Sequence, residues 1–331
     1  MTTPNHSVPA PTTAAPGTPH RRFRGMMPIL PTTISPAGEL DLVSQRRLVR
    51  YALACGAVAV GHLGAASEFY KLTVSDRSTL IETTVAGVDH RVPVFIGVTG
   101  ASTRIAVEQA RQAESLGADL LMLAMPYVTV PDAVGMRSHI AAVCSAVSVP
   151  VILQDTAASD QVLTPEVAVQ LFADIPNLAQ FKADGRNFLD KTARLLELDN
   201  RIEIIGGLGG KHMLHMLRLG ITSFMTGTEA LDLHAACVHA FLYGRPAEAA
   251  RVFDQQIAPY FAFYDAYPDE LLKRMLHWRG LIDHPDVIAP APPARISPAE
   301  WTAFTGILSG LEWRTDWSDL LGDTTDSLDL L

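Results

Sequence analysis

The chain has 331 residues, 48% of them hydrophobic and 18% charged, which is enough to bury a sizeable core. Its formal net charge is −9 and it contains no long basic run, which argues against nucleic acid or an anionic membrane surface as a partner. The three cysteines are scattered without a CxxC motif, which favours a reducing cytoplasm over a disulfide framework or a zinc site. No apolar run approaches the roughly 20 residues of a membrane span.

The two ends of the chain differ in composition from the rest. Residues 1–24 are rich in Pro, Thr and Ala and lack the charged start and apolar stretch of a signal peptide, so we expect a disordered segment. Residues 313–331 are acidic, and we expect a loose tail there. The folded part of a soluble, cytoplasmic protein should therefore lie between them.

Residues 25–230 alternate between short apolar runs and longer stretches with helical periodicity. Eight runs follow one another: GMMPILP, AVAVGHL, VPVFIGV, ADLLMLA, VPVILQ, NLAQFK, IEIIGG and ITSFMTG. Runs that stay apolar over four to six residues are typical of parallel strands buried on both faces. Eight strand–helix units predict an α/β fold, a (β/α)8 TIM barrel. A doubly wound open sheet is the alternative, because periodicity does not show whether a sheet closes.

Helix signals support the intervening stretches and continue beyond the last run. Thr164 precedes Pro165 at the start of an amphipathic stretch, as an N-cap residue and a first-turn proline would. Residues 231–312 read as further amphipathic helices packed beside the barrel. This appendix holds most of the aromatic residues of the second half, so we expect it to be the oligomer surface.

Catalytic residues of a barrel lie at the carboxyl ends of its strands. In this chain those ends carry Gly64–Phe69, Thr99, Pro126–Tyr127, Gln154–Asp155, Lys182, Gly206–Gly210 and Thr226–Glu229. Lys182 is the only lysine among them. Partial burial of its amine would disfavour the ammonium form, and a neutral amine attacks a ketone to form a Schiff base. The alternative is an ordinary solvated lysine where a strand ends.

The other strand-end residues leave several functions open. Tyr127 could exchange a proton with a substrate or pack against a neighbouring subunit. Gln154 could hold a substrate oxygen, whereas Asp155 could be a general base, a hydrogen-bond anchor or a loop cap. The turn Gly206–Gly210 could bring backbone N–H groups to a phosphate, or it could simply clear space for substrate. His212 and His215 have no further ligands at a suitable spacing, so no metal site is expected.

The order of motifs resembles the dihydrodipicolinate synthase / N-acetylneuraminate lyase family over about residues 25–310. The segments that carry the resemblance are GAASEFYKLTVSDR, ADLLMLAMPY and the stretch from VILQD to QFKAD. The resemblance implies that Lys182 forms the Schiff base with a 2-oxo acid. It also implies a homotetramer built from dimers and no metal or organic cofactor.

The chain departs from the family pattern at several positions. Gln154 stands where most members have a proton-relaying tyrosine, and Ala65 and Ala66 replace two hydroxyl residues. The acid that often follows the lysine is Ala183 here, with Asp184 one step later. The proton relay of the standard aldolase is therefore missing. The QD and SEF motifs resemble a dehydratase subgroup typified by 2-dehydro-3-deoxy-L-arabinonate dehydratase.

These observations predict a lysine Schiff-base lyase that dehydrates a 2-keto-3-deoxy sugar acid. A pyruvate-dependent aldolase is one alternative, and a barrel that binds a 2-oxo acid without catalysis is another. Lys182 is the predicted nucleophile and Tyr127 the candidate proton shuttle. The predicted substrate-binding residues are Ser67, Ala66, Gln154, Asp155, Gly207 and Thr226.

Overall fold

The computed structural model describes residues 22–157, 159, 162–264, 267–291, 295–311 and 313–321. Most of the expected disordered segment (1–24) and residues 322–331 of the expected tail lie outside the described residues.

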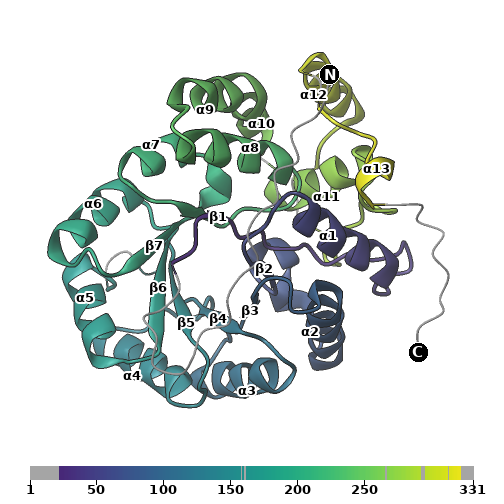
Figure 1. The fold of residues 1–331 in the computed structure, drawn as a ribbon. Coiled ribbons are helices and arrows are strands. Elements are labelled where there is room, and N and C mark those ends of the chain that lie inside the picture. The colour runs from purple at the N-terminus through teal and green to yellow at the C-terminus, as the bar shows by residue number, and fades with distance from the viewer. Residues whose placement is uncertain are drawn as a thin grey trace.

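Eight parallel strands form the centre of the molecule (Figure 1). They are β1 (Gly25–Met26), β2 (Val60–His62), β3 (Val94–Gly97), β4 (Leu120–Leu123), β5 (Val151–Asp155), β6 (Leu178–Ala183), β7 (Glu203–Gly206) and β8 (Ser223–Phe224). Their order is β1-β8-β7-β6-β5-β4-β3-β2. A parallel bridge between Ile29 and Gly61 joins the chain just after β1 to β2. The sheet therefore closes, which confirms the barrel and excludes the open doubly wound sheet.

Eight helices surround the barrel (Figure 1). They are α1 (Leu42–Ala54), α2 (Val74–Val88), α3 (Thr103–Ser115), α4 (Ala133–Cys144), α5 (Pro165–Asp174), α6 (Phe188–Leu198), α7 (Met213–Arg218) and α8 (Leu231–Leu242). Polar side chains cap several of them. Thr164, for example, accepts a hydrogen bond from the Val167 N–H, and Pro165 follows in the first turn, as the sequence predicts.

The alternation of side chains along each strand separates two apolar cores. Met27, Phe95 and Ile152 belong to a cluster inside the barrel, whereas Leu153 and Phe181 belong to the larger core between the sheet and the helices. Consecutive strand residues point to opposite faces of a sheet. This rule decides which polar residues at the strand ends can enter the barrel.

The C-terminal part adds helices on one side of the ring (Figure 1). They are α9 (Pro246–Val252), a π-helical turn (Phe253–Ile257), α10 (Ala258–Tyr264), α11 (Pro268–Trp278), α12 (Pro298–Gly310) and α13 (Ser318–Leu321). Helix α8 packs against β1 and α7, so it completes the barrel. The sequence-based boundary at residue 230 instead places this helix in the appendix.

Residues 313–321 do not form the loose tail that their acidity suggests. The Trp317 ring packs edge-on against Tyr51 of α1, with 4.8 Å between ring centroids, and Arg279 lies over its face at 4.9 Å. The Trp313 indole N–H donates to the Gln256 carbonyl in the π-helical turn at 3.0 Å. Two buried indoles therefore fasten this segment to the folded body, and this outweighs its charge.

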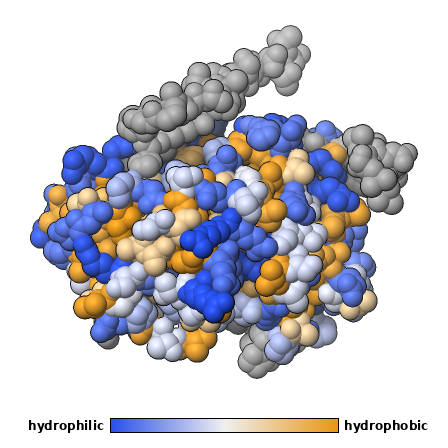
Figure 2. Space-filling model, turned by 90° about the horizontal axis from the view of Figure 1, so that it is seen from below, coloured by the Kyte–Doolittle hydropathy of each residue, from blue (hydrophilic) through white to orange (hydrophobic). Residues whose placement is uncertain are grey.

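The surface shows no broad apolar band on the face in Figure 2, where hydrophobic residues are interspersed with hydrophilic ones. Among the described residues, no helix is both long enough and apolar enough to cross a membrane.

Candidate active site

Lys182 is a buried amine on the inner side of β6. Its neighbours in register are Gln154 on β5 and Ile205 on β7. Phe181 and Ala183 point to the outer core, so the lysine between them points the other way, into the barrel. Lys182 is only 6% exposed. It is therefore not the solvated lysine that the sequence left as the alternative.

Asp184 is the ionic partner of this lysine. One carboxylate oxygen lies 2.7 Å from the Lys182 Nζ and accepts a hydrogen bond from the Gln154 amide, also at 2.7 Å. The other oxygen accepts the Leu208 backbone N–H at 2.6 Å. From the sequence, Asp184 stands out only as an acid displaced by one position from the family pattern. Its spacing of two from Lys182 was the available signal, because residues two apart on a strand share a face.

The glycine-rich turn after β7 receives the Asp184 carboxylate. A Cβ atom on Gly207 would lie 1.6 Å from the Asp184 Oδ1, so no side chain fits at this position. The neighbouring Leu208 N–H, which could have approached a phosphate, already binds that same oxygen. The glycine-rich turn does clear space, which is the alternative to phosphate binding that the sequence offers. The Asp184 carboxylate occupies this space.

Asp155 lies on the opposite face of the sheet from Gln154. It is fully buried, and its carboxylate pairs with Lys191 of α6 at 2.8 Å and accepts a hydrogen bond from Ser159 at 3.0 Å. It points toward the helices because it is adjacent to Gln154 on the same strand. Asp155 is therefore an anchor for α6, and the expectation that it lines the pocket is wrong.

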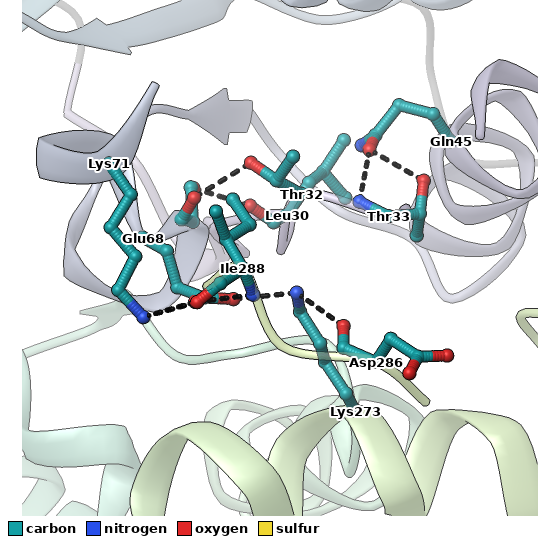
Figure 3. Close-up of polar contacts among 10 residues, drawn as sticks. Leu30, Thr32, Thr33, Gln45, Glu68, Lys71, Lys273, Asp286 and Ile288 are labelled. Carbon is teal, nitrogen blue, oxygen red and sulfur yellow. Dashed lines mark hydrogen bonds and ion pairs between the residues drawn. The ribbon is translucent and has the colours of Figure 1, made fainter. Parts of the chain in front are cut away.

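Ser67 and Ala66 lie in the 3-10 turn Ala65–Ser67, which follows β2. The Ser67 hydroxyl is completely buried and donates to the Leu30 carbonyl at 2.5 Å, so it ties the turn to the segment after β1 rather than facing a substrate. Figure 3 shows this connection. Ala66 packs against the apolar cluster inside the barrel, so the turn borders the barrel mouth.

Tyr127 and Thr226 contact residues other than Lys182 and Asp184. Tyr127 is 52% exposed, and its ring packs edge-on against Phe69 with 5.7 Å between centroids. Thr226 is buried and donates its hydroxyl hydrogen to the Gly227 carbonyl at 2.9 Å. Within the part of the chain that the structure describes, no hydrogen bond joins either residue to Lys182. Tyr127 as proton shuttle therefore stays a prediction.

Glu229, the acid beyond β8, belongs to the packing of the appendix. It is 1% exposed, and the Tyr260 hydroxyl of α10 donates to its carboxylate at 2.5 Å. Burial raises the pKa of Glu229 above its ordinary value. The described residues contain no group of three or more His, Cys, Asp or Glu side chains that could hold a metal ion.

This arrangement can carry out carbonyl chemistry. A primary amine in an apolar interior can attack a ketone, and the adjacent carboxylate can accept the proton that the amine must first lose. The same carboxylate stays within reach of atoms next to the new carbon–nitrogen bond. A buried lysine beside a carboxylate supplies the nucleophile and the proton acceptor of a Schiff-base site.

Known proteins of similar sequence carry names that fit this chemistry. L-2-keto-3-deoxyarabonate dehydratase from Azospirillum brasilense is 30% identical over 235 residues, which cover 69% of this chain and 75% of the relative. A probable 5-dehydro-4-deoxyglucarate dehydratase from Saccharopolyspora erythraea is 36% identical over 172 residues, 51% of this chain and 54% of the relative.

Solved structures show the same fold. The 4-hydroxy-tetrahydrodipicolinate synthase from Methylacidiphilum fumariolicum superposes with a TM-score of 0.80 at 21% identity, covering 90% of this chain and 98% of that one. The model of the dihydrodipicolinate synthetase family matches residues 22–300. A match over most of the sequence, together with the barrel and its buried lysine, shows that the chain belongs to the dihydrodipicolinate synthetase family.

Proposed function

We propose that this chain is a lyase that forms a Schiff base through Lys182 and dehydrates a 2-keto-3-deoxy sugar acid. The observation that carries the proposal is the buried pair of Lys182 Nζ and Asp184 Oδ2, 2.7 Å apart inside the barrel. Family membership supports a lyase that acts on 2-oxo acids. The dehydratase names of two relatives support elimination of water as the reaction.

The proposed reaction starts with proton transfer from the Lys182 amine to Asp184. The neutral amine adds to the 2-keto carbon, and Asp184 gives its proton to the keto oxygen, which leaves as water; the resulting protonated imine withdraws electrons from C3. Asp184 then takes the C3 proton, and a double bond forms between C3 and C4 as the C4 hydroxyl leaves. Asp184 returns the proton to that hydroxyl, so water departs. Hydrolysis of the imine frees the product and Lys182, and the substrate has lost one water in total.

Gln154 gives a reason to favour dehydration over the aldolase alternative. Its amide holds the Asp184 carboxylate and cannot itself titrate, so protons would pass through Asp184 alone. Elimination needs no group that handles an incoming aldehyde. A barrel that only binds 2-oxo acids would not need a buried lysine beside a carboxylate, because burying such a pair is costly.

Substrate contacts are assigned to residues around this pair. Ala66 would border the bound acid from the turn after β2, and Gly207 would leave room for the Asp184 carboxylate. Thr226 and Tyr127 would contribute from the ends of β8 and β4. Three free cysteines support the reducing cytoplasm as the compartment.

We further infer that copies of the chain assemble into a homotetramer built from dimers. Exposed apolar side chains gather on the loops after β2 and β4, where Tyr70 is 47%, Tyr127 52% and Val128 72% exposed. Clusters of this kind mark interaction surfaces. These loops, more than the C-terminal appendix, are the proposed contact. Light scattering on the full chain should give the mass of four chains, and the mass of one chain would contradict the assembly.

The first test is chemical trapping of the imine. The purified chain would be mixed with pyruvate or with a 2-keto-3-deoxy pentonate, reduced with borohydride and analysed by intact mass and peptide mapping. We expect a stable adduct on Lys182 and turnover of the pentonate with loss of water. Lys191 provides an internal control, because it is also buried beside an aspartate but lies outside the barrel interior.

The matching variant is Lys182→Ala. We expect it to keep the far-ultraviolet circular dichroism spectrum of the native chain while it loses both the adduct and the turnover. Full activity in a folded Lys182→Ala chain would refute the Schiff-base mechanism.

A further inference from the structure

The turn that borders the barrel mouth ends at Glu68, a buried acid with an unusual backbone. Glu68 is 1% exposed, and its φ of 53° lies in the left-handed region that residues with a side chain rarely adopt. It directly follows the turn Ala65–Ser67, whose Ala66 packs against the interior cluster. Whatever holds Glu68 therefore also holds this edge of the pocket.

Three groups converge on the Glu68 carboxylate (Figure 3). The Lys273 Nζ lies 2.6 Å from one oxygen, and the Lys71 Nζ lies 2.8 Å from the other. The Ile288 backbone N–H donates to this second oxygen at 3.0 Å. One carboxylate thus faces two ammonium groups and one amide, and the Glu68 and Lys273 side chains are each only 1% exposed.

Lys273 connects this cluster to the C-terminal appendix. It belongs to α11, is 1% exposed and donates a hydrogen bond to the Asp286 carbonyl at 2.8 Å. Lys71 in turn donates to the Ile288 carbonyl at 2.8 Å. The turn after β2, helix α11 and the chain around 286–288 are therefore joined at one point, although they are distant in sequence.

The other side of the turn is fastened to the segment after β1. The Ser67 hydroxyl donates to the Leu30 carbonyl at 2.5 Å, and the Thr32 hydroxyl donates to the Ser67 carbonyl at 2.7 Å. Both contacts are buried and shown in Figure 3. The turn is thus held from two directions, by neutral hydrogen bonds toward the barrel and by charges toward α11.

We propose that Glu68 and Lys273 are positioning residues for substrate binding, through which helix α11 fixes the turn that borders the pocket. This inference rests on the proposed function. Well-packed apolar side chains would often stabilise a fold as much as a buried ion pair does, but a charged pair with these hydrogen bonds favours one geometry. Among the described residues, Lys182 pairs with Asp184 and the cluster is centred on Glu68, so the cluster should govern how well the acid binds rather than how fast the imine reacts.

The test measures KM and kcat in variants of α11 that differ by one position. Lys273→Met removes the charge but keeps most of the side-chain stem. We expect KM for the 2-keto-3-deoxy acid to rise roughly tenfold or more, with kcat within about threefold of the native value. Lys273→Arg restores the charge and should recover most of the lost affinity.

Arg274→Met is the matched control. Arg274 is the next residue of α11 and pairs with Glu270 at 3.2 Å, away from the turn. Its loss should lower stability without raising KM. If Lys273→Met leaves KM unchanged, or changes it no more than Arg274→Met does, the proposal is wrong.

Glu68→Gln covers the case in which Lys273→Met does not fold. The amide is almost the same size as the carboxylate and can still accept the Ile288 N–H. A raised KM in this variant would support the proposal, and an unchanged KM would overturn it. The double variant with Glu68→Gln and Lys273→Met should lose little more affinity than each single variant, because both substitutions remove the same ion pair. Absence of an imine adduct in the native enzyme would refute the proposed function. An adduct in the native enzyme together with an unchanged KM in the variants would refute the role of Glu68 and Lys273.

Discussion

Lys182 and Asp184 occupy a setting that burial alone would make unfavourable. Two opposite charges lie within 2.7 Å of each other, and neither side chain is more than 13% exposed. Desolvation of such a pair offsets much of its Coulomb attraction. The carboxylate is further held by the Gln154 amide and the Leu208 N–H, so its position is set by three different parts of the chain, the ends of β5 and β6 and the turn after β7. Such orientation is what proton transfer to a defined atom requires.

The variant Asp184→Asn tests this role. The side-chain oxygen can still accept the Leu208 N–H, but the group can no longer take up a proton. We expect turnover of the 2-keto-3-deoxy acid to fall about 10²- to 10⁴-fold, the range for loss of a general acid–base group. Borohydride should still trap an adduct on Lys182 after longer incubation. Turnover within a few-fold of the native rate would assign proton transfer to another residue.

At the scale of elements, the ends of β5, β6 and β7 form one unit. The side chains of Gln154, Lys182 and Asp184 come from β5 and β6, and the turn after β7 is shaped around them. Glycine is required at position 207 because of a close approach and not because of its backbone angles. The sequence predicts that these strand ends lie together. It does not show why position 207 is glycine, because that depends on where the Asp184 side chain lies.

Gly207→Ala should therefore damage the site without unfolding the barrel. The added methyl group would overlap the Asp184 Oδ1, so the carboxylate must leave its present position between the Leu208 N–H and Lys182. We expect a fall in kcat of roughly 100-fold, as for displacement of a catalytic group by about 1 Å.

Gly306→Ala in α12 is the control for that substitution. A Cβ atom there meets no neighbour within 4 Å, and alanine is the better helix former. This variant should keep full activity and gain about 0.5–1 kcal/mol in the free energy of unfolding. Equal activities of the two variants would mean that Gly207 does not position Asp184.

Across the whole molecule, two fully buried histidines contribute to the response to acid. Burial lowers the pKa of His62 to about 3 and that of His234 to about 4. An unfolded histidine titrates near pH 6.5. Between these values the unfolded chain binds protons that the folded chain refuses, so stability falls as the pH falls. Glu229 has the opposite trend. Burial raises its pKa, so its contribution to the free energy of unfolding decreases as the pH rises above about 4.5.

The variant His234→Leu isolates one of these contributions. Native chain should lose up to about 1.4 kcal/mol of stability per pH unit for each buried histidine as the pH falls from about 6.5 toward 4. The variant should show a slope that is shallower by up to that amount, since Glu229 contributes equally to both proteins. Urea unfolding followed by circular dichroism at several pH values measures both slopes. Parallel slopes would show that His234 is protonated in the folded chain.

Several features of the molecule follow from its sequence alone. The eight apolar runs predict the strands, and the helix caps such as Thr164 are correctly located, because period and capping are local properties. Lys182 is identified as the lysine at a strand end for the same reason. Asp155 is predicted from the sequence as a pocket residue or a hydrogen-bond anchor, and its pairing with Lys191 favours the anchor, as the two-residue period of a strand requires for the neighbour of Gln154.

Only the tertiary structure decided the rest. Closure of the barrel between β1 and β2, the packing of Trp317 on Tyr51 and the ion pair of Glu68 with Lys273 each join segments far apart in the chain. No local pattern encodes such contacts, because their free energy depends on which surfaces meet after the barrel has closed. The sequence by itself determined eight strand–helix units with Lys182 at the end of the sixth strand, whereas the folded contacts determined that the sheet closes, which acid pairs with Lys182 and what holds Glu68.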